Sequence, residues 1–503
     1  MRGGILGMEN APAEGGLTVK AGIISFGKLV TSLSSLAAAA ILSRFLSKTD
    51  YGTYRQVWLI YNTVAPVLIL GLPVSVNYFV PRMKPSEQKA LNLQTYLLLA
   101  ALGLILSLLL FLGAPFVARS FDNAALTEML RIFSLIPVLT LPTLYYQNLF
   151  ICLNKARLAA EISILTGITQ VGAVVVPVVL GYGIRTVFLS LVVFSVFQLV
   201  VVTYATFRPF VGGQKEWTKL LPIDQLKYAI PIGLSGIAGT LTQQVDKIMI
   251  STYFLAAQYA IYCNGATEVP LIDIITGSVT AVLMPEFVRV YENHDTQALI
   301  RIWNNAIRKV SLIILPTMLF LGVFATEALT FLFSEEYAAS AGIFRIYLLA
   351  LPLRVTNYAM LFMAMGRSGL VFRYSSYTLA CNIALNFVLL KVVGFSGPAI
   401  GTVLTLYFTA ALRLWKIAKL LRTPLPIVVP WRVLGKILSI SVVAALPTVV
   451  FKVLSPFSNN ILNLLVGGGI FGVFYVGGVT LLGALCVEDI RLIGQFFRQS
   501  WRK

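Results

Sequence analysis

Long apolar runs fill this chain from about residue 21 to about residue 486, and short polar loops join them almost everywhere. A helix that spans a membrane needs roughly 20 mainly apolar residues, and the sequence holds about fourteen such runs. Since 58% of the residues are hydrophobic and 12% are charged, no segment is left for a water-soluble domain. The chain is therefore predicted to work inside a membrane.

The runs predict an all-α polytopic membrane protein with about fourteen transmembrane helices. In lipid every backbone polar group must be satisfied within the structure, and the runs are too long for the strands of an outer-membrane barrel. The predicted spans cover about residues 21–43, 56–80, 92–117, 131–153, 160–182, 186–207, 228–254, 259–284, 305–326, 343–365, 371–393, 397–418, 433–453 and 461–485.

The chain has a net charge of +19, and its basic residues are distributed as the predicted topology requires. The charge therefore does not indicate nucleic-acid binding. If the amino terminus is cytoplasmic, that side receives about 27 of the 39 basic residues, which is the positive-inside asymmetry. Both termini are then expected in the cytoplasm, with a secondary attraction of the basic loops to membrane lipids. The largest cytoplasmic group is Arg413, Lys416, Lys419, Arg422, Arg432 and Lys436.

The chain is expected to lack metal sites and cofactors. Its four cysteines have no paired spacing, and its single histidine, His294, lies in a loop. Neither arrangement supplies the ligand spacing of a zinc or haem site.

Two alignments within the chain indicate an internal repeat. The segment FLSKTDYGTY from Phe45 matches FLAAQYAIY from Phe254, with the tyrosines at an offset of 208, and NKARLAAEISILTGITQ from Asn154 matches GRSGLVFRYSSYTLACN from Gly366 at 212. We therefore predict two pseudo-symmetric six-helix bundles plus two C-terminal helices. The predicted parts are a cytoplasmic tail (1–20), an N-lobe (21–210), a C-lobe (221–422), and a final part with two spans and a cytoplasmic tail (423–503). Parallel repeats of this kind place a substrate between the halves and suggest alternating access.

Basic residues inside the spans are candidate substrate contacts, because a charge in a membrane costs about 2.5 to 3.5 kcal/mol on insertion scales. Lys28 lies in the first span and Arg55 opens the second; snorkelling and interfacial anchoring are the alternatives for them. Arg354 lies in the middle of the tenth span. Its planar guanidinium fork could hold a phosphate.

Acidic residues inside the spans are candidates for ion coupling. Asp246 and Lys247 are neighbours in span seven, so they point about 100° apart and are expected to have different partners. Glu268 and Asp273 share span eight with no basic residue. A buried carboxylate without a fixed cation can take up and release a proton, which suggests H⁺ or Na⁺ coupling. The alternative is that Lys247 or Arg354 permanently neutralises one of these acids.

A polar stripe follows span eleven. Ser375, Thr378, Asn382 and Asn386 recur at intervals of three and four residues and so share one helix face. They could bind sugar hydroxyls or line a wet cavity; alternatively, they bond neighbouring helices.

The chain resembles polysaccharide-export flippases of the O-antigen transporter type, within the multidrug/oligosaccharidyl-lipid/polysaccharide exporter superfamily. The resemblance rests on FGKLVTSLSSLAAAAILSRFLSKTDYGTY near the start, QQVDKIMIS in span seven, MAMGRSG after span ten and GFSGPAIGT before span twelve. It implies transport of an undecaprenyl-diphosphate-linked oligosaccharide from the inner to the outer leaflet of the bacterial cytoplasmic (inner) membrane. It also suggests a place beside the polysaccharide polymerase machinery.

Three alternatives remain beside this interpretation. A peptidoglycan-precursor flippase or a multidrug exporter would share the two lobes, although the latter usually has twelve spans. A polysaccharide polymerase or ligase would be an enzyme, but the sequence has no large outer loop with residues for glycosyl transfer, and Glu268 and Asp273 are predicted to be buried. The chain is therefore expected not to be an enzyme.

Overall fold

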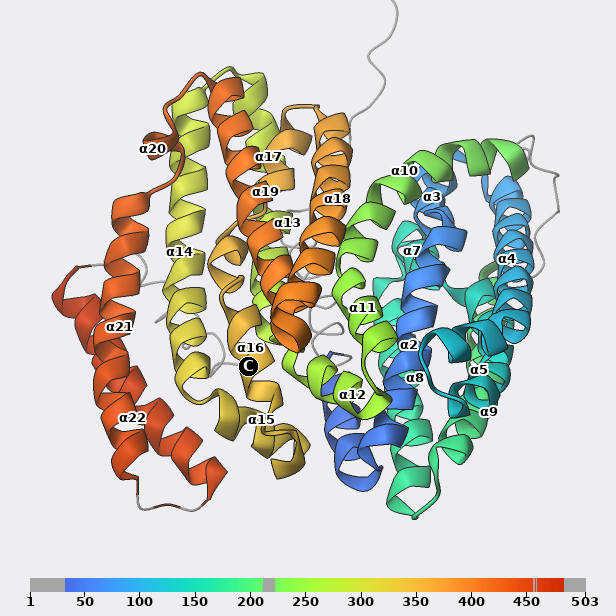
Figure 1. Cartoon of the computed structure of the whole chain (residues 1–503). Helices are drawn as coiled ribbons and strands as arrows, with labels where there is room; N and C mark the ends of the chain where they lie inside the picture. The colour runs from blue at the N-terminus through green and yellow to red at the C-terminus, as the bar shows by residue number, and fades with distance from the viewer. Residues whose placement is uncertain (1–31, 211–221, 456, 458, 484–503) are drawn as a thin grey trace, which may run out of the picture. The chain divides into compact units, whose positions relative to one another are not determined.

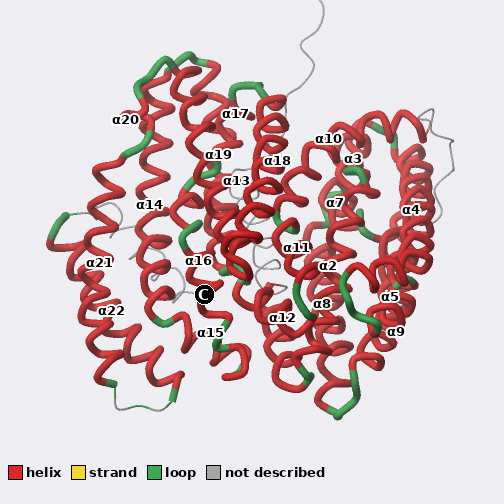
Figure 2. The backbone as a smooth tube through the Cα atoms, in the orientation of Figure 1, coloured by secondary structure: helices red, strands yellow, loops and turns green. Residues whose placement is uncertain are grey.

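The computed structural model describes residues 32–210, 222–455, 457 and 459–483 (Figure 1). Within these ranges the chain forms helices joined by turns, and none of the described residues lies in a β-strand (Figure 2). This confirms the prediction of an all-α membrane protein. Long apolar helices suit a membrane because they satisfy their own backbone hydrogen bonds.

Within the residues that it describes, the structure identifies fewer membrane-spanning helices than the sequence predicts. Ten helices in the described part of the chain are long and apolar enough to cross a membrane, or eleven if the bent pair Ser340–Leu348 and Leu351–Ala364 forms one span. One of the ten, Ser368–Leu421, contains both α18 and α19. The first predicted span lies partly outside the described residues, and its described part is the helix Ser32–Phe45. The count of fourteen stays a prediction.

The chain divides into two compact units, each described by itself here. Unit 1 comprises Met1–Ala39, Val64–Pro115 and Thr127–Leu234, and unit 2 comprises Ala40–Thr63, Phe116–Leu126 and Ser235–Lys503. The helices that lie wholly or mainly in unit 1 are α3 (Leu72–Phe79), α4 (Pro85–Ser120), α5 (Ala125–Phe133), α6 (Leu135–Thr140), α7 (Tyr146–Cys152), α8 (Ala156–Val179), α9 (Ile184–Phe207) and α10 (Pro222–Thr242), with the 3₁₀ turns η1 (Val80–Arg82), η2 (Leu141–Thr143) and η3 (Arg208–Phe210).

Unit 2 contains the remaining helices. They are most of α2 (Lys48–Ile69), α11 (Val245–Tyr253), α12 (Ala256–Gly265), α13 (Pro270–Glu292), α14 (Thr296–Val323), α15 (Ala325–Phe333), α16 (Ser340–Leu348), α17 (Tyr358–Ala364), α18 (Ser368–Val393), α19 (Gly397–Leu421), α20 (Leu425–Val428), α21 (Trp431–Leu454) and α22 (Asn460–Leu481), with η4 (Glu335–Tyr337), η5 (Leu351–Val355) and η6 (Gly394–Ser396).

The segments aligned by the predicted repeat adopt the same local structure. Helices α7 and α17 each end in a turn with a left-handed residue, Asn154 (φ 58°) and Gly366 (φ 67°). In both turns the next residue donates its N–H across the turn, from Lys155 to the Phe150 carbonyl at 2.7 Å and from Arg367 to the Phe362 carbonyl at 2.8 Å. The offset of 212 is preserved residue by residue in these hydrogen bonds.

Unit 1 is held together by a buried apolar cluster and one polar hub. The cluster joins α3, α4 and α7 through residues such as Leu72, Leu99 and Leu149. At its centre the Gln225 amide of α10 donates to Ser75 Oγ at 3.0 Å and to Thr95 Oγ1 at 2.9 Å. Since all three side chains are fully buried, these hydrogen bonds satisfy polar groups that would otherwise be costly.

In unit 2 the C-terminal pair α21 and α22 packs on α14 and α15. Lys452 of α21 forms an ion pair of 2.8 Å with Glu327 of α15, and the Tyr475 hydroxyl of α22 donates to the Leu312 carbonyl at 2.8 Å. Gly467 allows α22 to approach the Phe324 ring closely. The last two predicted spans are thus attached to unit 2 by specific polar contacts as well as by apolar packing.

Candidate functional site

Three of the predicted spans in unit 2 are broken helices, and the charged side chains lie at or beside the breaks. Span seven is interrupted between α10 and α11 just before Asp246, and span eight between α12 and α13 at residues 266–269, which include Glu268. Span ten passes from α16 through the 3₁₀ turn η5 with Arg354 to α17, with a bend of 42°. Broken helices at membrane depth expose backbone groups and occur where they line a cavity or a binding site.

The breaks surround a cavity of about 310 Å³ within unit 2. Its wall also includes Gln243, Tyr347, Thr402 and Arg413. Six of the residues predicted from the sequence line it, namely Asp246, Lys247, Glu268, Arg354, Ser375 and Thr378.

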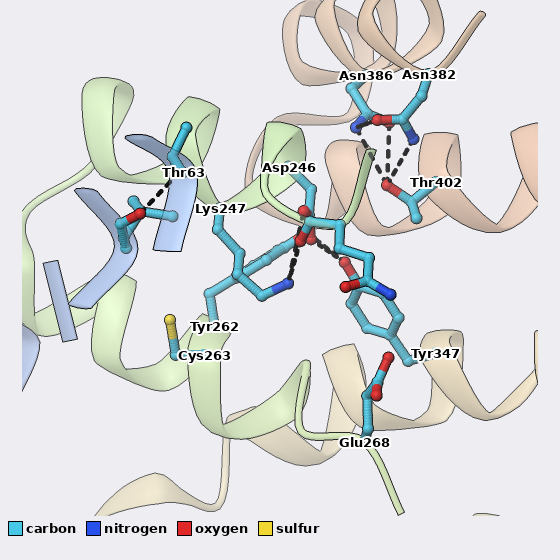
Figure 3. A network of polar contacts seen from close by, with 12 residues as sticks. Thr63, Asp246, Lys247, Tyr262, Cys263, Glu268, Tyr347, Asn382, Asn386 and Thr402 are labelled. Atoms are coloured by element: carbon cyan, nitrogen blue, oxygen red, sulfur yellow. Dashed lines mark hydrogen bonds and ion pairs between the residues drawn. The ribbon is translucent and has the colours of Figure 1, made fainter. Parts of the chain in front are cut away.

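Asp246 is the most deeply buried charge in the wall, with a side chain that is 1% exposed. Its Oδ2 accepts hydrogen bonds from the Tyr262 hydroxyl at 3.1 Å and from the Tyr347 hydroxyl, and the two hydroxyl oxygens lie 3.1 Å apart. Figure 3 shows Lys247 and both tyrosines gathered around this carboxylate. The two tyrosines, from α12 and α16, fix the carboxylate's position and leave its Oδ1 without a hydrogen-bond donor among the described residues.

The prediction that Asp246 and Lys247 have different partners is wrong in part. The Lys247 ammonium curls back along its own helix, where it donates to the Gln243 carbonyl at 2.6 Å and lies 3.8 Å from Asp246 Oδ1. A long flexible stem overcomes the angular separation of neighbouring residues. Asp246 still has its own partners, the two tyrosines.

Glu268 has a cation beside it. This favours the alternative that Arg354 neutralises an acid of span eight. Arg354 Nη2 lies 2.7 Å from Glu268 Oε1, and the two side chains are 34% and 52% exposed. Neither residue is in an α-helix: Glu268 lies between α12 and α13, and Arg354 lies in the 3₁₀ turn η5. The ion pair is therefore partly exposed, whereas the Asp246 side chain in the same wall is buried.

Arg413 is a cavity residue that the sequence analysis assigned to the cytoplasmic group. It projects from α19, and its Nη2 donates to Thr378 Oγ1 at 3.1 Å. Arg413 and Arg354 also line a second cavity of about 490 Å³, which adjoins the first. A signal was present in the sequence, since Thr402, Leu406, Thr409 and Arg413 recur at intervals of four, three and four and so share one helix face.

The polar stripe of α18 divides into two parts. Ser375 and Thr378 line the cavity. Asn382 and Asn386 are fully buried, and each amide donates to Thr402 Oγ1 of α19 at 3.1 Å. The second half of the stripe thus bonds two neighbouring helices, which is the alternative stated for it.

Three predicted site residues are not among those that line the cavity in the described part of the chain. Lys28 is outside the described residues, and Asp273 belongs to α13 but its side chain is outside the described set. Arg55 lies over the Tyr51 ring, 6.0 Å from its centroid, and is not among the residues that line the cavity.

The fold is similar to that of solved membrane transporters. It resembles the lipid II flippase MurJ in an inward closed conformation, with a TM-score of 0.72 and 14% identity over 91% of this chain and 98% of that one. An inward-facing multidrug resistance MATE family transporter matches with a TM-score of 0.65 and 13% identity over 78% and 94%. The MATE transporter VcmN of Vibrio cholerae matches with 0.57 and 14% over 81% and 98%. The chain is thus a polytopic membrane protein with the fold of these solved transporters.

The family can be stated more closely from the sequence. The polysaccharide biosynthesis protein family matches residues 41–342, which is more than half of the chain. The chain belongs to this family, and the resemblance to polysaccharide flippases of the superfamily is confirmed. Among curated proteins, no sequence matches.

Proposed function

We propose that this protein is a lipid-linked oligosaccharide flippase, which moves an undecaprenyl-diphosphate-linked glycan from the inner to the outer leaflet by alternating access. One observation carries the proposal: three basic residues, Lys247, Arg354 and Arg413, line a cavity in a bundle of apolar helices. The described lining holds two carboxylates, Asp246 and Glu268, so one positive charge is in excess. Basic groups at membrane depth are costly unless an anion or a function compensates them. In a member of a polysaccharide biosynthesis family, the diphosphate of a lipid-linked sugar is an anion of the right chemistry.

The residues around these cations suit the two parts of such a cargo. An arginine fork can hold phosphate oxygens with two parallel hydrogen bonds. Ser375, Thr378 and Gln243 supply hydroxyl and amide groups in the same wall, which match the hydroxyls of a sugar.

Ion coupling is the proposed energy source, with Asp246 as its first candidate. Its carboxylate is buried, is fixed by two tyrosine hydroxyls and has one oxygen without a hydrogen-bond donor among the described residues. That oxygen also lies 3.8 Å from the Lys247 ammonium, so an incoming H⁺ or Na⁺ would compete with this lysine for it. Glu268, which is bound to Arg354, would join the coupling only when that arginine has another partner, and Asp273 remains a candidate from its place in span eight.

The proposed location is the bacterial cytoplasmic membrane, with both termini in the cytoplasm and a polysaccharide polymerase as the next step on the outer side. The excess of basic residues on one side of the predicted topology supports the orientation. A peptidoglycan-precursor flippase is the second candidate, and the fold likeness to the lipid II flippase favours it over a multidrug exporter.

A reconstituted assay tests the proposal. The full chain is placed in liposomes with a fluorescent undecaprenyl-diphosphate-linked oligosaccharide, and flipping is measured with a quencher that cannot cross the membrane. With the wild type, the quencher is expected to reach lipid that started in either leaflet. Arg354→Ala is expected to slow flipping at least about tenfold. The matched control is Arg157→Ala, because Arg157 is 90% exposed and pairs with Glu161 on its own helix. Faster movement of lipid II than of the oligosaccharide would favour the second candidate, and movement of neither would overturn both.

A further inference from the structure

We propose that the cavity binds its anionic cargo by counter-ion exchange: a phosphate group docks on Arg413 and displaces Glu268 from Arg354. The inference rests on the proposed function and deepens it, because it assigns the diphosphate of the cargo to a specific pair of arginines. It also gives Glu268 a role as a resident anion that the cargo must replace.

Arg413 is the first contact because it is a cation without a carboxylate. In the part of the chain that the structure describes, no aspartate or glutamate lies within ion-pair distance of its guanidinium, and its hydrogen bond goes to the neutral Thr378 hydroxyl at 3.1 Å. The side chain is half-buried on α19. A half-buried guanidinium without a counter-ion is unfavourable, so this position gains from a ligand anion. Thr378 holds the group in place and leaves its remaining donors available.

Arg354 is the second contact because it lines the same two adjoining cavities as Arg413. An anion where the two cavities adjoin would lie in a space that both arginines line. A diphosphate suits this arrangement, since it offers separate sets of oxygens to two planar forks. A single carboxylate fills only one of them.

Glu268 is placed to compete with that anion. Its carboxylate lies 2.7 Å from Arg354 Nη2, on the broken segment between α12 and α13, and its side chain is 52% exposed. An exposed ion pair contributes little stability, and a backbone outside a regular helix moves at lower cost than one inside it. The pair can therefore open when a dianionic group offers Arg354 a stronger partner. Asp246, by contrast, is held by two tyrosines and is 1% exposed, so it stays in place.

The exchange also separates cargo by charge. A ligand with one weak negative group offers Arg354 no more than Glu268 already does, so it displaces Glu268 less readily than a diphosphate does. A diphosphate gains both arginines. Glu268 thus makes the site selective for strongly anionic head groups, and it keeps Arg354 neutralised while the cavity holds no cargo.

Calorimetric titration of the detergent-solubilised full chain tests the exchange without transport. The probes are inorganic pyrophosphate and farnesyl diphosphate, which distinguish a free diphosphate from a lipid-linked one. We expect Glu268→Gln to bind both probes about tenfold more tightly, and Arg413→Gln to bind them at least about tenfold more weakly. Arg413→Lys, which keeps the charge and loses the fork, is expected between the wild type and Arg413→Gln. Farnesyl diphosphate is expected to bind more tightly than pyrophosphate.

The double variant Glu268→Gln with Arg354→Gln identifies the route of the effect. If Glu268 acts by occupying Arg354, the double variant binds pyrophosphate no more tightly than Arg354→Gln alone. Lys419→Gln is the charge control, because Lys419 lies on the same helix over the Trp415 ring and outside the cavity wall. Unchanged or weaker binding in Glu268→Gln, or wild-type binding in Arg413→Gln, overturns the exchange even where liposome flipping is intact. If the variants change probe binding as expected but the chain flips no lipid in liposomes, the exchange stands and the proposed function is wrong.

Discussion

Gly52, one turn into α2, packs directly against the backbone carbonyl of Ala256, the first residue of α12. Both residues belong to unit 2, although they come from the predicted N-terminal and C-terminal repeats. Around them the Tyr51 hydroxyl donates to Asn264 Oδ1 at 2.8 Å, and the Gln56 amide donates to Ser251 Oγ at 2.9 Å. The start of α2 is therefore built into the core of unit 2 by close backbone approach and by buried hydrogen bonds.

Gly52→Ala should separate these two helices. The added Cβ would overlap a backbone oxygen that cannot rotate away, so the free energy of unfolding is expected to fall by about 2 to 3 kcal/mol. The measurement is thermal unfolding in detergent, followed by tryptophan fluorescence. Gly172→Ala is the control, because a Cβ at residue 172 of α8 meets open space and should leave stability unchanged or slightly raised. An equal loss in both variants would show that packing at Gly52 is not the cause.

Asp246→Asn should remove ion coupling without unfolding the protein. The asparagine oxygen can still accept from Tyr262 and Tyr347, whereas the charge that would attract H⁺ or Na⁺ is gone. We expect liposome flipping to lose its dependence on an imposed ion gradient and to slow at least about tenfold. Asp122→Asn is the control, since Asp122 lies in an exposed turn with φ 45°, a conformation that asparagine adopts readily. Gradient-dependent flipping that persists in Asp246→Asn would remove Asp246 from the coupling.

The long apolar runs predict the helices of this protein because burial in lipid leaves few other structures for the backbone. They do not predict where the helices break. Apolar runs continue on both sides of the breaks at residues 243–244, 266–269 and 349–357, and hydropathy does not record whether a peptide group bonds its own helix or faces a cavity. Polar residues such as Gln243 and Glu268 mark these places, but each is equally compatible with an intact helix.

Most of the cavity residues could be found from the cost of placing a charge in a membrane, but their pairing could not. Glu268 and Arg354 are 86 residues apart, and only the packing of α13, η5 and α14 brings their segments together. Arg413 was missed for a related reason. Near the end of a span, a basic residue is equally well explained as part of the cytoplasmic charge, and only the helix face that it shares with Thr402 and Thr409 indicates the cavity.

Asn382→Leu and Ser375→Ala should have opposite effects, which separates the two halves of the α18 stripe. Asn382 is buried and donates to Thr402, so its loss is expected to lower the free energy of unfolding by about 1 to 2 kcal/mol and to leave flipping per folded molecule unchanged. Ser375 lines the cavity, so its loss is expected to slow flipping a few-fold at constant stability. Stability and flipping are measured on the same preparations. Reduced flipping in folded Asn382→Leu would return that residue to the substrate site.

Lys452→Met should loosen the C-terminal pair α21 and α22 from α15. It would leave the Glu327 carboxylate, 13% exposed, without its cation at 2.8 Å, and it would also remove the hydrogen bond to the Val323 carbonyl at 2.7 Å. Because breaking a buried ion pair by removing one partner is strongly destabilising, the expected loss is about 3 kcal/mol. The double variant Lys452→Met with Glu327→Gln should recover most of this loss, since no buried charge remains.

The exposed ion pair between Lys48 and Glu336 provides the matched comparison for Lys452. Its atoms lie 3.4 Å apart, but its side chains are 36% and 69% exposed, so solvent screens it and Lys48→Met is expected to cost less than about 1 kcal/mol. Thermal unfolding in detergent is measured for all three variants and the wild type. If Lys452→Met costs no more than Lys48→Met, or if the double variant is no more stable than Lys452→Met, then apolar packing rather than the ion pair holds α21 on α15.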